Sequence, residues 1–353
     1  MKVIAPYDLT TDGGIARPSP KNVYDSTGTL VTVPAGQVAI TYDPSNLDAA
    51  PWVAIDGTDV VSTTGAFVYS NLPENDAPAW SAATAYAVGD KCVRLHRVYE
   101  AQQASTNKPP ETNSSGTAPA WLDLGATNQR ACLDLIVGST SSGPDRLFFV
   151  FRPGKFASAL ELLNIDANDV RVSMVDENGV ARYQQTKDLR IKKRTFTDWF
   201  FKPVERKTSA VFEGLPFYSK GLITLTITKA GSTASVGEVL IGRTYKVGKL
   251  QWEPEIRGLR YSKITTDDFG RTTFLKRRDA KEITADVMVD NDVVEEATRV
   301  LDIYTTQPLG IYADVGSNKF GGLLTALGFV SDYRTVLKSP AGSLINIKIQ
   351  GFV

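Results

Sequence analysis

Several residue types that carry chemistry are scarce in this chain of 353 residues, which has one histidine, two cysteines and three methionines. Cys92, Cys132 and His96 cannot form a four-ligand zinc site without carboxylates, and no closely spaced cysteine pair exists. His96 is the one imidazole, which argues against Ser-His-Asp and Cys-His catalysis. The sequence therefore predicts no metal, no cofactor and no catalytic residue.

The formal net charge is zero, because the basic residues Lys and Arg total 39 and the acidic residues Asp and Glu also total 39. This balance argues against nucleic acid or an anionic membrane as the main partner. No apolar run is long enough to span a bilayer, so we expect no membrane insertion. The first eight residues turn polar too early for a signal peptide, and we expect assembly in a cytoplasm.

The scarce residues have simple structural interpretations. Cys92 and Cys132 could form a disulfide, but small buried hydrophobic residues are the favoured interpretation for both. His96 lies between two short alternating runs and is expected to be an exposed turn residue.

The chain is rich in short β patterns separated by turn residues, which predicts a mainly β fold. Residues 1–77 form an extended, turn-rich arm, with strands expected at 29–33 and 38–42. That arm could wrap a neighbouring subunit or form an ordinary β layer. After a distinct unit at 78–125, residues 126–245 predict an antiparallel β-sandwich of the jelly-roll kind. Its expected strands lie at 133–137, 146–151, 159–165, 170–175, 181–183, 210–212, 222–228 and 235–242.

Residues 246–353 predict an α+β domain. Asp292 as N-cap with Glu295 three residues later, followed by Val300 and Leu301, predicts a helix from 292 to 304. Residues 261–278 predict a strand, a turn at Asp267-Asp-Phe-Gly and a second strand. The letters Asp-Phe-Gly also occur in kinases, but no glycine-rich loop or catalytic loop accompanies them.

A basic run with aromatics, from Arg190 to Lys207, allows two interpretations. It could contact phosphate-bearing sugar or nucleic acid. The favoured alternative is a loop leading into a core strand, with Trp199 and Phe201 pointing inward and the basic side chains in solvent. Asp188, Asp198 and Glu205 offset part of the positive charge.

The unit at 78–125 begins and ends with Pro-Ala-Trp, at Trp80 and Trp121. Between these lie Tyr86, a Val-Gly-Asp turn at 88–90 and Tyr99. Two alternating runs, 91–95 and 97–101, predict a small unit of two or three strands. Because so short a unit has little core, its aromatic side chains must supply most of the burial.

This pattern resembles the small chitin- and cellulose-binding modules found beside secreted polysaccharide hydrolases. Trp80, Tyr86, Gly89, Asp90, Val93, Tyr99 and Trp121 occupy the positions of that pattern. The resemblance implies carbohydrate binding by Trp80, Tyr86, Tyr99 and Trp121. The alternative is that Tyr86, Tyr99 and one tryptophan form the core. Leu122 stands where such modules often carry a second aromatic, so one stacking platform is missing.

Taken in order, the arm, the module, the junction at 125–130, the sandwich and the segment 261–278 resemble a virion-associated protein of tailed bacteriophages. The resemblance implies a structural, non-enzymatic component of the tail or a tail appendage. It also implies a symmetric oligomer that contacts other tail proteins, with host surface polysaccharide as a further candidate partner. The alternatives are a receptor-binding adhesin and a glycan hydrolase with an accessory module.

Overall fold

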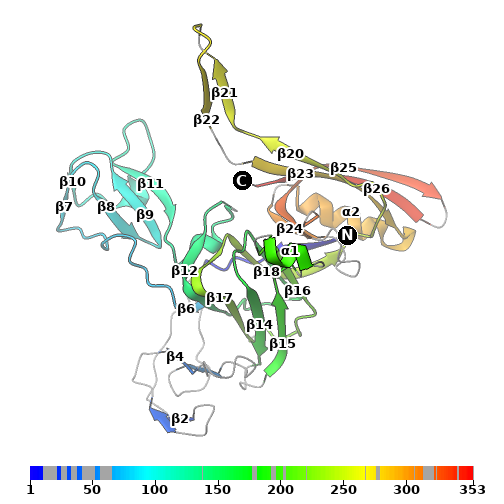
Figure 1. The fold of residues 1–353 in the computed structure, drawn as a ribbon, viewed down its shortest axis with the longest axis horizontal. Helices are drawn as coiled ribbons and strands as arrows, with labels where there is room; N and C mark the ends of the chain where they lie inside the picture. Colours follow the sequence, from blue (N-terminus) through cyan, green and yellow to red (C-terminus); the bar gives the residue numbers. More distant parts are fainter. Residues whose placement is uncertain are drawn as a thin grey trace.

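The computed structural model describes residues 1–10, 22–24, 30–32, 38–41, 52–55 and 66–352, with gaps at 137, 177–180, 192–195, 202–203, 220, 267, 276–278, 306, 313–321, 323 and 340–341. Strands dominate this part of the chain, which confirms the mainly β fold. Figure 1 shows a strand-rich body from which a cyan module and a yellow hairpin project.

The body is built on one antiparallel sheet of ten strands. Its central strand is β1, which pairs with β18 on one side and β24 on the other. The strands in spatial order are β16 (Ser209–Glu213), β13 (Ala159–Leu163), β18 (Glu238–Lys246), β1 (Lys2–Pro6), β24 (Leu309–Tyr312), β25 (Ala326–Ser339), β26 (Gly342–Gly351), β23 (Asp279–Val289) and β19 (Lys249–Leu250), with β20 (Glu255–Arg260) also paired to β23.

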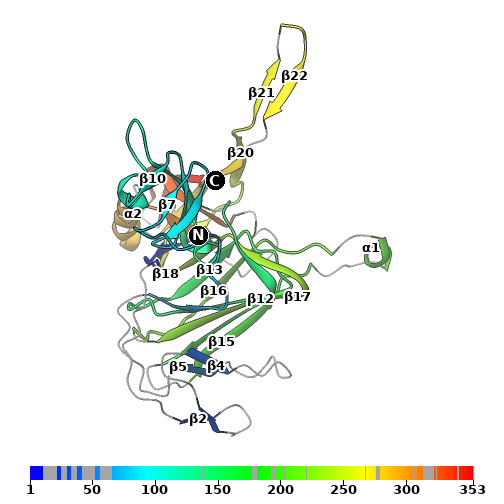
Figure 2. The same ribbon diagram turned by 90° about the vertical axis from the view of Figure 1, so that its left-hand side faces the viewer.

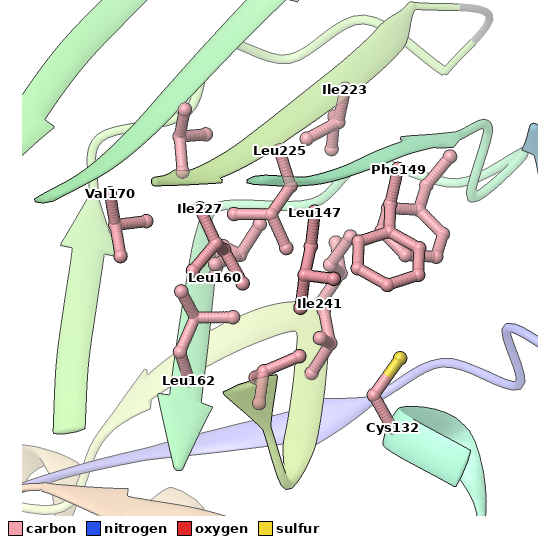
Figure 3. Close-up of a cluster of buried hydrophobic side chains, with 14 of the residues drawn as sticks. Cys132, Leu147, Phe149, Leu160, Leu162, Val170, Ile223, Leu225, Ile227 and Ile241 are labelled. Carbon is pink, nitrogen blue, oxygen red and sulfur yellow. The ribbon is translucent and has the colours of Figure 1, made fainter. Parts of the chain in front are cut away.

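A second sheet packs against one part of the large sheet and completes a β-sandwich. Its order is β15 (Ala181–Asp188), β14 (Asp169–Val175), β17 (Leu222–Val236), β12 (Ser141–Phe151) and β6 (Phe67–Ser70). Leu147 and Phe149 from β12 meet Leu160 from β13 and Ile241 from β18 in the core between the sheets (Figure 3). Consecutive residues of these strands are buried, most completely in β13, where all five residues are buried.

The other part of the large sheet is covered by helix α2 (Val294–Ile303). Ala297, Val300 and Leu301 point from this helix into a core that also contains Val3 and Ile347. The predicted helix is confirmed, but Asp292 is not its N-cap. Asp292 lies in a preceding 3-10 turn, η3 (Asn291–Val293), and α2 begins without a side-chain cap.

The large sheet is strongly curled. A side chain added at Gly310 in β24 would place its Cβ 2.1 Å from Glu161 Oε2 in β13. Two strands, β18 and β1, lie between β13 and β24, so β13 and β24 would be about 14 Å apart in a flat sheet. The curl brings them closer together. Glu161 is fully buried, and neither carboxyl oxygen has a hydrogen-bond partner among the described residues. Burial raises the pKa of Glu161 well above its ordinary value, because the charged form loses water.

The N-terminal region that the sequence predicts as an arm contributes to both sheets of the body. Lys2–Pro6 forms the central strand β1, and Phe67–Ser70 forms the edge strand β6. Between them, β2 (Asn22–Tyr24) pairs with β3 (Leu30–Thr32), and β4 (Val38–Thr41) pairs with β5 (Trp52–Ile55), which confirms the strands expected near 29–33 and 38–42. The rest of 11–65 lies outside the described residues, and the predicted domain boundaries stay predictions.

Two local predictions are wrong. The run starting at Leu133 is not a strand, because Ala131–Leu133 forms a 3-10 turn, η2, whose side chains are buried. The aromatic segment within the basic run is a short helix, α1 (Phe196–Phe201), rather than a loop. Phe201 does not point inward, because it is 81% exposed. In Figure 2, α1 stands apart from the sandwich.

The predicted hairpin in the C-terminal part is confirmed. Strand β21 (Lys263–Thr266) pairs with β22 (Thr272–Leu275), and the Asp-Phe-Gly letters lie at the turn. Gly270 adopts a φ of +78°, a conformation that glycine tolerates without a steric cost. The hairpin extends far from the rest of the body in both views (Figures 1 and 2).

A buried carboxyl in β18 makes stability depend on pH. Burial raises the pKa of Glu238 to about 9, nearby Asp134 adds to the rise, and a backbone hydrogen bond from Leu135 opposes it. The folded state therefore holds a proton that the unfolded chain releases near pH 4.5, the ordinary pKa of a glutamate. This stabilisation is fully present below about pH 4.5 and is lost as pH rises to about 9.

We expect Glu238→Gln to flatten the fall of melting temperature between those pH values. The substitution removes at most about 1.4 kcal/mol per pH unit from the pH dependence of the free energy of unfolding. Thermal unfolding followed by circular dichroism across this range measures it. Glu161 contributes with the same sign, so the slope should become shallower without vanishing. Glu255→Gln, at an exposed position, is the control. Parallel curves for Glu238→Gln and the wild type would contradict the expectation.

Candidate functional site: the 78–125 module and its joint

The module contains a three-stranded sheet and a two-stranded ribbon. The sheet order is β11 (Trp121–Ala126), β9 (Arg97–Ala101) and β8 (Lys91–Arg94), while β10 (Ser105–Thr106) pairs with β7 (Ala85–Tyr86). The Val-Gly-Asp motif has a structural role. Gly89 takes a φ of +91°, and the Asp90 carboxylate accepts a 2.7 Å hydrogen bond from the Ala87 backbone N–H. The motif therefore holds the turn that starts β8.

Three of the four predicted sugar-binding side chains form the module core. Trp121, Tyr99 and Tyr86 are 0%, 3% and 8% exposed. The rings of Tyr86 and Trp121 meet edge to face, with centroids 5.0 Å apart. Trp121 Nε1 donates to the Lys108 carbonyl at 2.9 Å, which ties the loop before β11 to the core. Tyr86 Oη accepts from the Ser81 N–H at 2.8 Å.

Trp80 is the member of the set that reaches the surface. It is half-buried against this core. The Arg94 guanidinium lies over the indole, 4.1 Å from the ring centroid, a cation–π arrangement. Arg94 Nε is also 2.7 Å from Glu111 Oε2. Arg94 Nε makes no hydrogen bond despite this short distance, so its contact with Glu111 is an ion pair. Trp80 and Arg94 together form a small surface patch, with one ring face occupied by the protein's own cation.

This geometry separates folding from binding within the motif. A buried ring cannot stack on a sugar, so Tyr86, Tyr99 and Trp121 have the core positions that the alternative interpretation expects. Of the four side chains, Trp80 keeps partly exposed surface, and the Arg94 guanidinium covers one face of its ring. Sugar binding by the module stays a prediction, now centred on those two side chains.

The module is attached to the body through a carboxylate that sequence reasoning did not single out. Glu74 Oε1 lies 2.8 Å from His96 Nδ1 and accepts a 2.7 Å hydrogen bond from Thr127 Oγ1. The Thr127 N–H also donates to the His96 carbonyl at 2.9 Å. Residues before, within and after the module thus meet at one point. His96 does lie in the predicted turn, between β8 and β9, but its side chain contacts Glu74 and is 33% exposed rather than fully in solvent.

The junction at 125–130 continues this joint toward the sandwich. Asn128 exchanges two hydrogen bonds of 2.8 and 2.9 Å with the backbone of Ser142. Gln129 Nε2 donates to the Leu72 carbonyl, and the Arg130 guanidinium lies 3.6 Å from the ring centroid of Phe67. The polar residues of this junction therefore fix how the module meets β6 and β12.

Both cysteines are free and buried, which confirms the favoured interpretation. Cys92 belongs to the module core and Cys132 to the sandwich core. Burial raises the pKa of Cys92 to about 11 and that of Cys132 to about 12, so both thiols stay protonated at neutral pH.

Within the part of the chain that the structure describes, no group of three or more His, Cys, Asp or Glu side chains is placed to hold a metal ion. The helices described there are also too short or too polar to cross a bilayer.

A second kind of candidate site consists of apolar side chains on projecting segments. Phe269 at the tip of the β21–β22 hairpin is 96% exposed, and Ile264 and Phe274 on its strands are 65% and 59% exposed. On α1, Phe196 and Phe200 pack on each other with ring centroids 4.9 Å apart, although both face solvent. Sequence reasoning missed this exposure, because β-branched and aromatic residues in a hairpin normally indicate burial.

The comparisons with known proteins leave the family open. Neither a protein-family model nor a curated protein matches the chain. Among solved structures, one described as the tail of an empty GTA particle with C6 symmetry shares 10% identity, covering 32% of this chain and 84% of that chain at a TM-score of 0.24. The lectin domain of lectinolysin complexed with Lewis B antigen shares 15% identity, covering 33% and 84% at 0.23. A histidine mutant of the lectin binding domain of lectinolysin, complexed with Lewis b, shares 17% identity, covering 33% and 83% at 0.23. Likenesses with such low TM-scores carry no weight for fold or role.

Trp121 and Trp80 should respond differently to truncation. Because Trp121 is fully buried, we expect Trp121→Ala to destabilise the module by about 3–5 kcal/mol and to raise hydrogen exchange throughout 78–125. Trp80→Ala should leave most of that protection in place, since Trp80 packs at the edge of the core. Exchange measured by mass spectrometry on both variants compares them. Unchanged protection in Trp121→Ala would contradict the assigned core role.

Proposed function

We propose that the chain is a structural component of a bacteriophage tail or tail appendage, that it assembles as a symmetric oligomer, and that it displays its small module toward the host surface. The observation that carries this proposal is the exposure of apolar side chains on two long projections, while the body has complete cores of its own. Such surfaces on a soluble protein mark interaction sites.

The hairpin supports an assembly role on physical grounds. An isolated two-stranded hairpin is marginally stable in water. Here every residue of β21 and β22 is exposed, so none of the residues that the structure describes forms a layer over either face. A neighbouring subunit would supply that layer and bury Ile264 and Phe274. The exposed phenylalanines of α1 offer a separate surface of the same kind.

The module fits the outward-facing part of such an assembly. It is set apart from the body and is connected on both sides through the Glu74 joint (Figure 1). A single half-exposed tryptophan provides at most on the order of 1 kcal/mol beyond area burial, judged from aromatic pairs. Useful affinity for a host polysaccharide would therefore come from many copies held on one particle.

A receptor-binding adhesin is the second candidate function, favoured by the surface patch of Trp80 and Arg94.

In either role, we propose that the chain works by contact rather than catalysis. Its single histidine is engaged with Glu74 at the joint, which supports a structural use of that residue. Incubation with host polysaccharide that released new reducing ends would contradict a non-catalytic role.

We expect the purified wild-type protein to form one oligomer of defined size, measured by light scattering coupled to size-exclusion chromatography. Gold-labelled antibodies to the module should bind tails at a fixed position in electron micrographs. A monodisperse monomer that associates with no tail component would contradict the structural proposal.

Trp80→Ala separates the structural role from the adhesin role. Under the structural proposal, oligomer size stays the same and phage adsorption changes little. Under the adhesin alternative, adsorption falls strongly while the oligomer persists. Phe329→Ala, outside the module, serves as the matched aromatic control in both measurements.

A further inference from the structure

The tip of the β21–β22 hairpin has the form of an apolar knob between opposite charges. Phe269 is 96% exposed, Asp268 precedes it, and Arg271 follows after Gly270. Because the hairpin extends away from the body in both views, its tip reaches space that a second molecule could occupy (Figures 1 and 2).

The same chain carries a groove that matches this knob. It has a volume of about 350 Å³ and lies between the β18–β19 segment and α2. Its apolar lining includes the exposed Val293, the half-buried Tyr245 and the buried Val247, Val289 and Val300. A cavity of about 150 Å³ suffices to hold a benzene ring, so a phenyl side chain fits with room for its backbone.

The charges at the groove complement those at the tip. Arg243, Lys246 and Lys249 line the side formed by the β18–β19 segment. Asp290, which follows β23, and Glu296 of α2 also line the groove, and all five charged side chains are exposed. An inserted Phe269 would place Asp268 near the lysines and Arg271 near the glutamate when the hairpin enters in one orientation. Such complementarity selects orientation and partner more than it adds affinity.

We propose that Phe269 of one copy inserts into the groove between β18–β19 and α2 of the next copy. The occupant is a second copy, because knob and groove are on the same chain and the hairpin points away from its own body. A knob that fits a groove elsewhere on the same protein makes a head-to-tail contact, and repeated head-to-tail contacts close into a ring when the rotation allows. This inference rests on the oligomer in the proposed function and names the surfaces that hold it together.

Two variants that each disable one surface test the contact. Phe269→Ser removes the knob and keeps the groove, while Val293→Trp fills the groove and keeps the knob; Val293 is 44% exposed at the groove, so the larger side chain has space. Each variant alone should be a monomer by light scattering. Mixed in equal amounts, they should form a species of twice the chain mass and grow no further, because only one functional knob–groove pair exists in the mixture.

Leu337→Ser is the matched control, since Leu337 is 78% exposed and lies outside both surfaces. It should keep the wild-type oligomer. A charge exchange gives a test that leaves the apolar contact intact: Arg271→Glu should weaken the oligomer, and adding Glu296→Lys should restore it. Circular dichroism of every variant confirms folding, and the exposed charge exchange remains decisive if Val293→Trp fails to fold.

The outcomes distinguish this inference from the function on which it rests. An oligomer that persists in Phe269→Ser and is unaffected by the charge exchange would overturn the knob-and-groove contact, while the tail role would stand. A wild-type protein that is monomeric and absent from tails would overturn both. Loss of assembly in Phe269→Ser, together with failure of Glu296→Lys to restore the oligomer of Arg271→Glu, would show that the hairpin docks elsewhere and would also overturn the assigned groove.

Discussion

Backbone pairing of residues 2–6 with β18 and of residues 2–4 with β24 holds the body together. Through it, β18 of the sandwich and β24 of the C-terminal part belong to one sheet. The strand is short, yet Val3 faces the core under α2 and Ile4 faces the opposite side with Tyr312. A chain segment of five residues thus connects two cores, because a central strand can satisfy hydrogen bonds on both edges and bury side chains on both faces.

The curl of that sheet encloses a carboxyl group in a costly environment. Glu161 is enclosed with Gly310 opposite it, where any larger side chain would collide with its carboxylate. Burying a carboxyl without partners opposes folding, so the surrounding apolar cores must offset it. Glu238 lies in a similar environment in β18. Burial raises the pKa of both carboxyl groups, and this couples the curled sheet to pH.

In the module, one set of aromatic residues forms the core. Tyr86, Tyr99 and Trp121 supply most of the large buried side chains in a unit too small to form a core from aliphatic residues. Their spacing therefore reflects folding requirements. The surface that is left for ligands depends on Trp80 and Arg94, and Arg94 forms no part of the motif. Attachment to the body relies instead on polar contacts around Glu74, which fix orientation without a large apolar interface.

Much of the local structure follows from the sequence. Alternation identified β8 and β9, a short β run identified β14, and the turn residues located the β21–β22 hairpin, because strand burial and turn geometry depend on near neighbours. The aromatic spacing also identified the module.

Sequence alone could not place Lys2–Pro6 at the centre of a sheet, since its partners lie more than two hundred residues away. Nor could it distinguish the buried Trp121 from the exposed Phe269. Both are aromatic residues near turns, and their exposure depends on which distant segments pack over them. Tertiary structure decided those cases, because burial is a property of the assembled layers and not of the local pattern.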